Sequence, residues 1–128
     1  MNKQTISNSV IGILGGGQLG KMLCIAAQRL GYLVHIYSEN IENPAINISD
    51  YHTIGNFDEF DKIDNFSNNC SIVTFETENI PKNALNRVAS LTKVAPGFKS
   101  LEITQDRVIE KKFLYSQNIA TANFFEIL

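Results

Sequence analysis

The chain has 128 residues, the length of one ordinary domain, and a chain of this length can bury a core without the help of disulfides or a metal. Hydrophobic residues make up 44% and charged residues 19% of it, a composition typical of a globular protein. Its 11 lysines and arginines against 13 acidic residues give a formal net charge of -2. This balance excludes the basic surface with which proteins grip nucleic-acid phosphates, so we expect no nucleic-acid partner.

Cysteine and histidine usage gives no sign of a metal or disulfide framework. Cys24 and Cys70 lack the paired spacing of metal ligands, and we expect two buried thiols in a reducing cytosol. His35 and His52 are expected to be structural. The longest apolar run, residues 10–14, is far shorter than the ~20 residues of a membrane helix, and the first residues lack a signal-peptide core. These patterns predict a cytoplasmic protein with no membrane partner.

The first part of the chain predicts a strand, a glycine-rich loop, a helix and a second strand. Residues 10–14 are a β-branched run, the loop covers 15–20, and residues 32–37 form the next apolar run after a helix C-cap at Gly31. Between them, apolar residues recur with helical spacing and predict the buried face of the helix: Leu19, Met22, Leu23, Ala26, Ala27 and Leu30. A strand–helix–strand crossover of this length favours a parallel sheet.

The alternation continues to about residue 95 and predicts a doubly wound α/β domain. Further strands are predicted at residues 51–54, 71–75 and 93–95, and helices at 57–66, from Pro81 onward, at 99–104 and at 106–117. The apolar residues 124–128 are predicted to begin a last strand. Beyond residue 97 the pattern is that of a connector entering another domain.

Gly15, Gly17 and Gly20 satisfy the pattern G-x-G-x-x-G between a strand and a helix. Such a loop lets a phosphate approach the backbone amides at the positive end of the helix dipole, although it can equally serve only close packing. A dinucleotide fold carries an acidic residue about 20 residues further on to bind a ribose, and Glu39 stands there. Its place at the start of a polar loop favours a solvated side chain. An NAD-type dinucleotide-binding domain of an oxidoreductase is therefore an alternative function.

A second candidate site follows the strand at residues 71–75. Glu76-Thr-Glu-Asn79 brings two carboxylates and an amide to the sheet edge where the glycine loop is expected, because parallel strands end at the same edge. Carboxylates there can accept hydrogen bonds from ribose hydroxyls or an amine. The alternative is an acidic region that caps the helix near Pro81.

A third candidate is a pair of cations, Arg107 and Lys111, one helical turn apart. Their shared face suits nucleotide phosphates. A solvated surface stripe, with Asp106 and Glu110 as local partners, accounts for them equally well.

Three motifs, in this order, resemble successive blocks of one family: Gly15-Gly-Gly-Gln-Leu-Gly-Lys-Met22, Phe75-Glu-Thr-Glu-Asn-Ile-Pro81 and Gln105-Asp-Arg-Val-Ile-Glu-Lys111. The family is N5-carboxyaminoimidazole ribonucleotide synthase, an ATP-grasp ligase also described as the ATPase subunit of phosphoribosylaminoimidazole carboxylase. The resemblance covers residues 10–128. It implies a Rossmann-like preATP-grasp domain over residues 1–97, with a parallel sheet flanked by helices. Residues 98–128 would be a helical connector and the start of a truncated ATP-grasp domain.

The resemblance also implies a reaction. Members of this family use ATP, bicarbonate and Mg²⁺ to carboxylate 5-aminoimidazole ribonucleotide in de novo purine biosynthesis. Carried over motif by motif, the substrate contacts implied here are Gly17, Gln18, Leu19, Glu76 and, as a further member of the same wall, Asn79. Arg107 matches the family arginine that contacts ATP.

The resemblance places no catalytic residue and no metal ligand within this chain, because the ATP-binding lysines, glycine lid and magnesium carboxylates would follow Leu128. We therefore expect the 128-residue chain alone to be inactive. The complete enzyme is expected to be a homodimer, or a separate chain carries the ATP-grasp domain, and a catalytically dead remnant is a further possibility. The chain departs from the family pattern at Thr77, where an aromatic residue is usual and packing behind Glu76 is affected, and at Ala120 and Asn123, where prolines are usual.

Overall fold

The computed structural model describes residues 9–127, and the chain divides into two compact units, Met1–Ala95 and Pro96–Leu128. The elements of the first unit are β1 (Val10–Leu14), α1 (Gln18–Arg29), β2 (Leu33–Ser38), the 3-10 helix η1 (Ile46–Ile48), β3 (Tyr51–Ile54), α2 (Phe60–Asn68), β4 (Ile72–Phe75) and α3 (Lys82–Leu91). The second unit holds α4 (Phe98–Thr104) and α5 (Arg107–Ser116). Residues 1–8, predicted to belong to the first domain, lie outside the described residues. So does Leu128, predicted to belong to a last strand.

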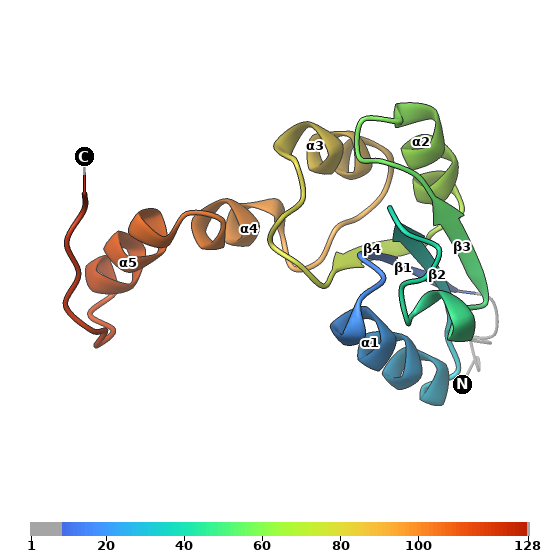
Figure 1. The fold of residues 1–128 in the computed structure, drawn as a ribbon, viewed down its shortest axis with the longest axis horizontal. Helices are drawn as coiled ribbons and strands as arrows, with labels where there is room; N and C mark the ends of the chain where they lie inside the picture. The colour runs from blue at the N-terminus through green and yellow to red at the C-terminus, as the bar shows by residue number, and fades with distance from the viewer. Residues whose placement is uncertain (1–8, 128) are drawn as a thin grey trace, which may run out of the picture. The chain divides into compact units, whose positions relative to one another are not determined.

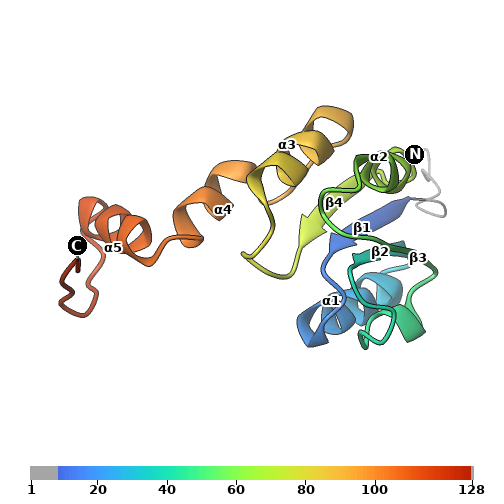
Figure 2. The ribbon, with the colours of Figure 1, turned by 45° about the horizontal axis from the view of Figure 1, so that its top comes forward.

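The four strands form one parallel sheet in the order β3-β2-β1-β4. Helix α1 covers one face of this sheet, whereas α2 and α3 cover the other (Figures 1 and 2). The predicted α/β architecture, a parallel sheet flanked by helices, is thereby confirmed. From β1 the chain moves through β2 and β3 in one direction, and β4 then returns to the other side of β1. The strand order therefore reverses between β1 and β4, the place where ligands bind in open parallel sheets.

Both faces of the sheet bury apolar side chains. The cluster on the α1 side consists of Ile13, Cys24, Ala27, Val34, Ile36, Ala45 and Ile46. On the α2 side, the ring of Phe66 lies 4.9 Å from that of His35 and 5.4 Å from that of Tyr37. The Tyr37 hydroxyl donates to the Asn56 carbonyl at 2.7 Å, and burial raises the pKa of Tyr37 to about 12. This two-sided burial explains why β1 and β2 are nearly continuous apolar runs.

The buried face of α1 differs from the prediction. Small residues face the sheet, namely Gly20, Cys24 and Ala27. Most of the predicted apolar stripe is exposed instead: Leu19 is 59%, Met22 57%, Leu23 40% and Leu30 72% exposed. Small side chains allow the helix axis to come close to the sheet, and this close packing leaves the larger side chains outside. Of the predicted stripe, Ala27 alone is buried.

The last two predicted strands differ from the structure. Residues 93–95 pair in parallel with β4, but only through one bridge between Val94 and Val73, because Pro96, which has no N–H to donate, follows at once. Residues 124–127 have no strand partner and take no regular structure, because a strand needs a neighbour to satisfy its backbone. The predicted strand at residues 93–95 is thus shortened to a single bridge, and the predicted strand from residue 124 is wrong for the residues described.

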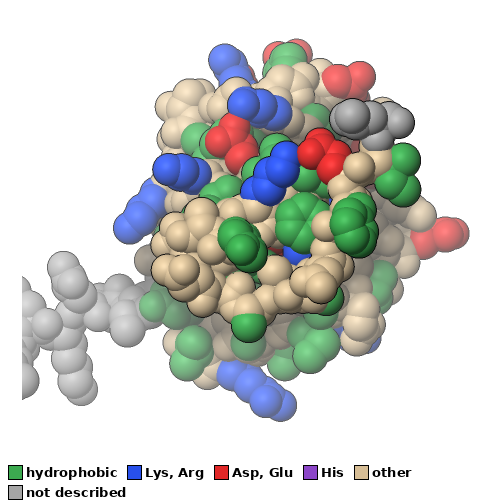
Figure 3. Space-filling model, turned by 90° about the vertical axis from the view of Figure 1, so that its left-hand side faces the viewer, with side chains coloured by type: hydrophobic (Ala, Val, Ile, Leu, Met, Phe, Trp, Pro, Cys, Tyr) green, Lys and Arg blue, Asp and Glu red, His purple; other side chains and the backbone are tan. Residues whose placement is uncertain are grey.

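The second unit is held largely by local contacts. The Asp106 carboxylate accepts the N–H groups of Val108 and Ile109 at 2.8 and 3.0 Å and caps α5. Lys112 pairs with Glu126 at 2.9 Å, which ties the following segment to the helix. No residue of α5 is buried. The face of the molecule drawn in Figure 3 shows hydrophobic side chains among charged ones. Within residues 9–127, no helix has both the length and the apolarity needed to cross a membrane.

Candidate functional site

The candidate site lies where β1 and β4 end side by side. The glycine loop follows β1 directly, and Glu76 is the first residue after β4. The Glu76 N–H donates to the Leu14 carbonyl at 3.1 Å, so the β1–β4 pairing continues one residue into the loop. The prediction that the glycine loop and the segment after residue 75 share one sheet edge is confirmed.

The Glu76 carboxylate bridges two amides of the glycine loop. Its Oε1 accepts the Gly17 N–H at 3.0 Å, and its Oε2 accepts the Gly20 N–H at 2.9 Å. Gly17 is the N-cap of α1, and Gly20 lies in its first turn. The negative charge therefore sits at the positive end of the α1 dipole, where it is stabilised. In a dinucleotide-binding loop a phosphate occupies this place.

Two further amides remain open at the same end of α1. Gln18 and Leu19 are the first helical residues, and their N–H groups have no acceptor among the residues that the structure describes. Both side chains are exposed. A ligand at this edge thus meets these two amides, the Gln18 side-chain amide, and those lone pairs of Glu76 that the glycine amides leave unused.

Asn79 forms its hydrogen bond within its own loop and not with the glycine loop. Its side chain is exposed, and its backbone N–H donates to the Thr77 hydroxyl at 3.2 Å. Helix α3 has Pro81 at its N-cap, and this residue makes no side-chain cap bond. The alternative that residues 76–79 are an acidic region at the start of this helix stays a prediction. The structure thus brings Glu76 and Gly17 into contact, with Gln18 and Leu19 next to Gly17. The hydrogen bond of Asn79 is made within its own loop.

Glu39 is exposed at the end of β2. The neighbouring Ser38 is buried and accepts the Asn43 side-chain amide at 2.7 Å. The loop then folds back on the glycine loop, where the Ala45 N–H donates to the Gly16 carbonyl at 3.0 Å. The exposure of Glu39 agrees with a solvated side chain, the second of the two interpretations.

Arg107 belongs to the second unit, at the start of α5. Its guanidinium pairs with Glu110 at 2.5 Å, and 79% of its side chain is exposed. Lys111 donates to the Thr121 hydroxyl. Both cations thus have local partners, as in the surface-stripe interpretation, but the exposed head group of Arg107 can exchange Glu110 for another anion.

A hollow of about 620 Å³ lies at the opposite, amino-terminal part of the sheet. It is lined by Val10, His35, Asp50, Tyr51, His52, Thr53, Asn65 and Asn69, none of which the sequence analysis assigned to a site. These residues come from separate segments and form no motif, so no sequence signal could have found the hollow. Because ligands of parallel sheets bind beyond the carboxyl ends of the strands, the glycine-loop edge is the stronger candidate.

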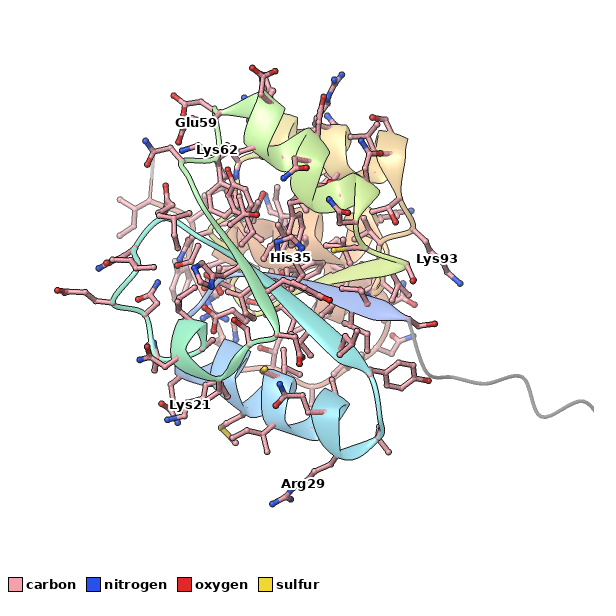
Figure 4. The ribbon with its side chains drawn as sticks, turned by 90° about the vertical axis from the view of Figure 1, so that its right-hand side faces the viewer. Lys21, Arg29, His35, Glu59, Lys62 and Lys93 are labelled. Atoms are coloured by element: carbon pink, nitrogen blue, oxygen red, sulfur yellow. The ribbon has the colours of Figure 1, made fainter. Side chains whose placement is uncertain are left out.

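His35, which lines this hollow, is a buried residue of the core. The His35 Nε2 lies 2.9 Å from the Thr53 hydroxyl, and Nδ1 is buried without a partner among the described residues. Burial, with a smaller effect from the charge of His52, lowers the pKa of His35 from 6.5 to about 4. Figure 4 places His35 inside the molecule, whereas Lys21 and Arg29 extend outward from α1. A neutral, packed histidine agrees with the expected structural role.

Among the described residues, the thiols and acidic groups form no metal centre. Cys24 and Cys70 are both free and buried, as predicted, and burial raises the pKa of both, that of Cys70 to about 12. Within residues 9–127, no cluster of three histidine, cysteine or acidic side chains is placed to hold a metal ion.

Comparison with known proteins gives a consistent set of relatives. The chain is 40% identical over 116 residues to the bifunctional purine synthesis protein purC/E of Dictyostelium discoideum, which covers 91% of this chain and 12% of that protein. It is 37% identical over 123 residues to the N5-carboxyaminoimidazole ribonucleotide synthase of Brucella melitensis, covering 95% of this chain and 34% of the relative.

A solved structure is similar over nearly the same length. The N5-carboxyaminoimidazole synthase of Aspergillus clavatus, in complex with ADP and 5-aminoimidazole ribonucleotide, matches with a TM-score of 0.81 and 33% identity. The match covers 93% of this chain and 32% of that one, so the chain spans about a third of the synthases it matches. Residues 8–105 match the family described as the ribonucleotide synthetase preATP-grasp domain. The chain therefore belongs to the ribonucleotide synthetase preATP-grasp domain family.

Proposed function

We propose that this domain forms the 5-aminoimidazole ribonucleotide-binding part of an ATP-dependent ligase of de novo purine biosynthesis. The ligase would carboxylate this ribonucleotide with bicarbonate to give N5-carboxyaminoimidazole ribonucleotide. The observation that carries the proposal is the match to the Aspergillus clavatus synthase, whose structure holds ADP and 5-aminoimidazole ribonucleotide, over 93% of this chain. Family membership and the polar edge beside the glycine loop agree with it.

The proposed substrate contacts are Gly17, Gln18, Leu19, Glu76 and Asn79. Glu76 would accept a hydrogen bond from the amine or a ribose hydroxyl, since each carboxylate oxygen keeps lone-pair capacity beyond its bond to the glycine loop. The exposed amides of Gln18 and Leu19 would donate to uncharged acceptors of the ligand. These groups orient the amine. The carboxyl group would come from carboxyphosphate, formed by phosphoryl transfer from ATP to bicarbonate, and the amine attacks its carbon as phosphate leaves.

The groups that bind ATP and Mg²⁺ are proposed to lie mostly in a further ATP-grasp domain. Arg107 would contribute to ATP binding from the connector, which we place at residues 98–128, after a preATP-grasp domain at residues 1–97. Residues 1–128 alone would contain no catalytic residue and no metal ligand, and would not turn over. The matched synthases are about three times as long, which supports this division.

The ATP-grasp domain would complete the active centre. It would belong to the same polypeptide, in which case the complete enzyme would be a homodimer, or a separate chain would carry it. We place the protein in the cytoplasm, where a reducing environment suits two free buried thiols.

A chimera tests the proposed function. Residues 8–105 would replace the matching segment of the Brucella melitensis synthase, and ATP hydrolysis would be measured with and without 5-aminoimidazole ribonucleotide. We expect the ribonucleotide to stimulate hydrolysis. Glu76→Gln in the chimera should lower kcat/KM for the ribonucleotide about 10- to 100-fold, because a hydrogen bond to a charged group contributes about 1.5–3 kcal/mol.

The matched control is Glu39→Gln, which removes the same charge from an exposed position at the end of β2. This variant should keep the kcat/KM of the parent chimera. A chimera that folds and binds ATP, yet hydrolyses it at the same rate with and without the ribonucleotide, would contradict the proposed function.

A further inference from the structure

The backbone amides of residues 17–20 at the start of α1, called here the amide cradle, already bind an anion that belongs to the protein. One Glu76 oxygen accepts the Gly17 N–H at 3.0 Å and the other accepts the Gly20 N–H at 2.9 Å. Helix α1 has 12 residues, long enough for its dipole to favour negative charge at this end. The carboxylate thus makes the bonds that a bound phosphate makes in other glycine loops.

The glycines of the loop fit this carboxylate closely. A Cβ on Gly17 would lie 2.9 Å from the Glu76 Oε1. Gly15 has a φ of +106°, which other residues rarely adopt, and a Cβ there would overlap the Glu76 side chain. The absence of side chains at these positions is therefore explained by the approach of Glu76, and the loop needs no phosphate to account for its sequence.

The charges around the amide cradle also argue against a bound phosphate. Residues 15–20 and 76–79 contain two glutamates and no lysine or arginine. The nearest cation along the chain, Lys21, extends outward from α1 (Figure 4). A phosphate near the open amides of Gln18 and Leu19 would therefore face the Glu76 carboxylate with no cation from either loop to offset the repulsion.

We propose that Glu76 is a built-in anion that fills the phosphate position of the glycine loop and keeps the phosphate group of any ligand out of that position. Removal of its charge would turn the loop into an anion-binding site. Glu76 is thus a specificity-determining residue: the edge selects hydrogen-bond donors and uncharged acceptors and rejects the diphosphate of a dinucleotide. This inference goes beyond the proposed function and does not depend on which ribonucleotide the domain binds.

The test is a titration of the ¹⁵N-labelled 128-residue chain with inorganic pyrophosphate at constant ionic strength, followed through the amide resonances of residues 17–20. In the wild-type chain these resonances should stay in place. In Glu76→Gln and Glu76→Ala they should shift saturably, with an apparent affinity at least about tenfold above any wild-type response. Glu39→Gln, which removes an equal charge at the same edge of the sheet, should behave like the wild type.

Two results would overturn the inference. One is saturable pyrophosphate binding at residues 17–20 of the wild-type chain. The other is a folded Glu76→Gln or Glu76→Ala chain in which the amide resonances of residues 17–20 still do not shift with pyrophosphate. The Gln variant keeps the size of the side chain, so it provides the answer if the Ala variant does not fold. Since pyrophosphate is not the proposed substrate, failure here leaves the ribonucleotide proposal standing, and failure of the chimera leaves this inference standing.

Discussion

At the scale of single residues, His35 couples the stability of the core to pH. Its ring is buried against Phe66, and burial lowers its pKa from 6.5 to about 4. Between these two values the unfolded chain binds the proton and the folded chain does not. The free energy of unfolding should therefore fall as the pH drops from about 6.5 toward 4. Glu59 and Asp64, whose pKa values are lowered by hydrogen bonds to Lys62 and Arg87, act in the same direction only below about pH 4.5.

The prediction for His35 is a loss of about 1.5 kcal/mol of unfolding free energy between pH 6.5 and pH 5, measured by urea denaturation. His35→Gln removes the titrating ring, so its unfolding free energy should be nearly flat over this range whatever its absolute value. His52→Gln removes the smaller of the two effects that lower the His35 pKa, so this variant should keep most of the wild-type slope. The same slope in His35→Gln and in the wild type would refute this assignment.

At the scale of elements, α1 gives a test of which helix face packs on the sheet. Ala27 is buried and Ala26, next to it, is exposed. Ala27→Leu should destabilise the protein by about 1–3 kcal/mol, because a well-packed core does not accept extra volume. Ala26→Leu makes the same chemical change and should alter the unfolding free energy by less than about 0.5 kcal/mol.

Denaturant unfolding of the two variants measures the difference directly. Leu30→Lys, at a position that is 72% exposed, should also have a small effect. If Ala26→Leu or Leu30→Lys proved more damaging than Ala27→Leu, the apolar stripe would be the packed face after all.

The same helix shows how far sequence reasoning extends. Glycines, prolines and β-branched runs locate most strands and helices within a few residues, since these residues restrict the local backbone. Helical periodicity finds the apolar stripe of α1, but it does not show that smaller residues such as Gly20 and Cys24 face the sheet. That choice depends on how closely the helix approaches the sheet, a tertiary property.

The candidate site was predictable to a similar extent. The rule that parallel strands end at one edge brings Gly17 and Glu76 to the same side of the sheet. Their hydrogen bond, however, requires β4 to lie directly beside β1, and the pattern of one sequence does not fix strand order. The hollow lined by His35 and Asn65 was not predictable, because four segments separated in the sequence form it.

At the scale of the whole molecule, the first unit contains all four strands and the candidate substrate edge. The second unit contains Arg107, the residue proposed to bind ATP, on a helix without buried residues. We therefore propose that the domain supplies one ligand-binding edge and that groups outside residues 1–128 carry out phosphoryl transfer. The proposal depends above all on binding of 5-aminoimidazole ribonucleotide at the edge formed by the glycine loop and Glu76.

The most direct measurement is a titration of the ¹⁵N-labelled 128-residue chain with 5-aminoimidazole ribonucleotide, and separately with NAD, followed by amide chemical shifts. We predict saturable shifts at residues 17–19 and at Glu76, with Asn79 affected less, and no saturable shift with NAD. Arg107→Ala should leave the ribonucleotide affinity unchanged. Ribonucleotide shifts confined to the hollow around His35, or saturable binding of NAD at the glycine loop, would contradict the proposed binding edge.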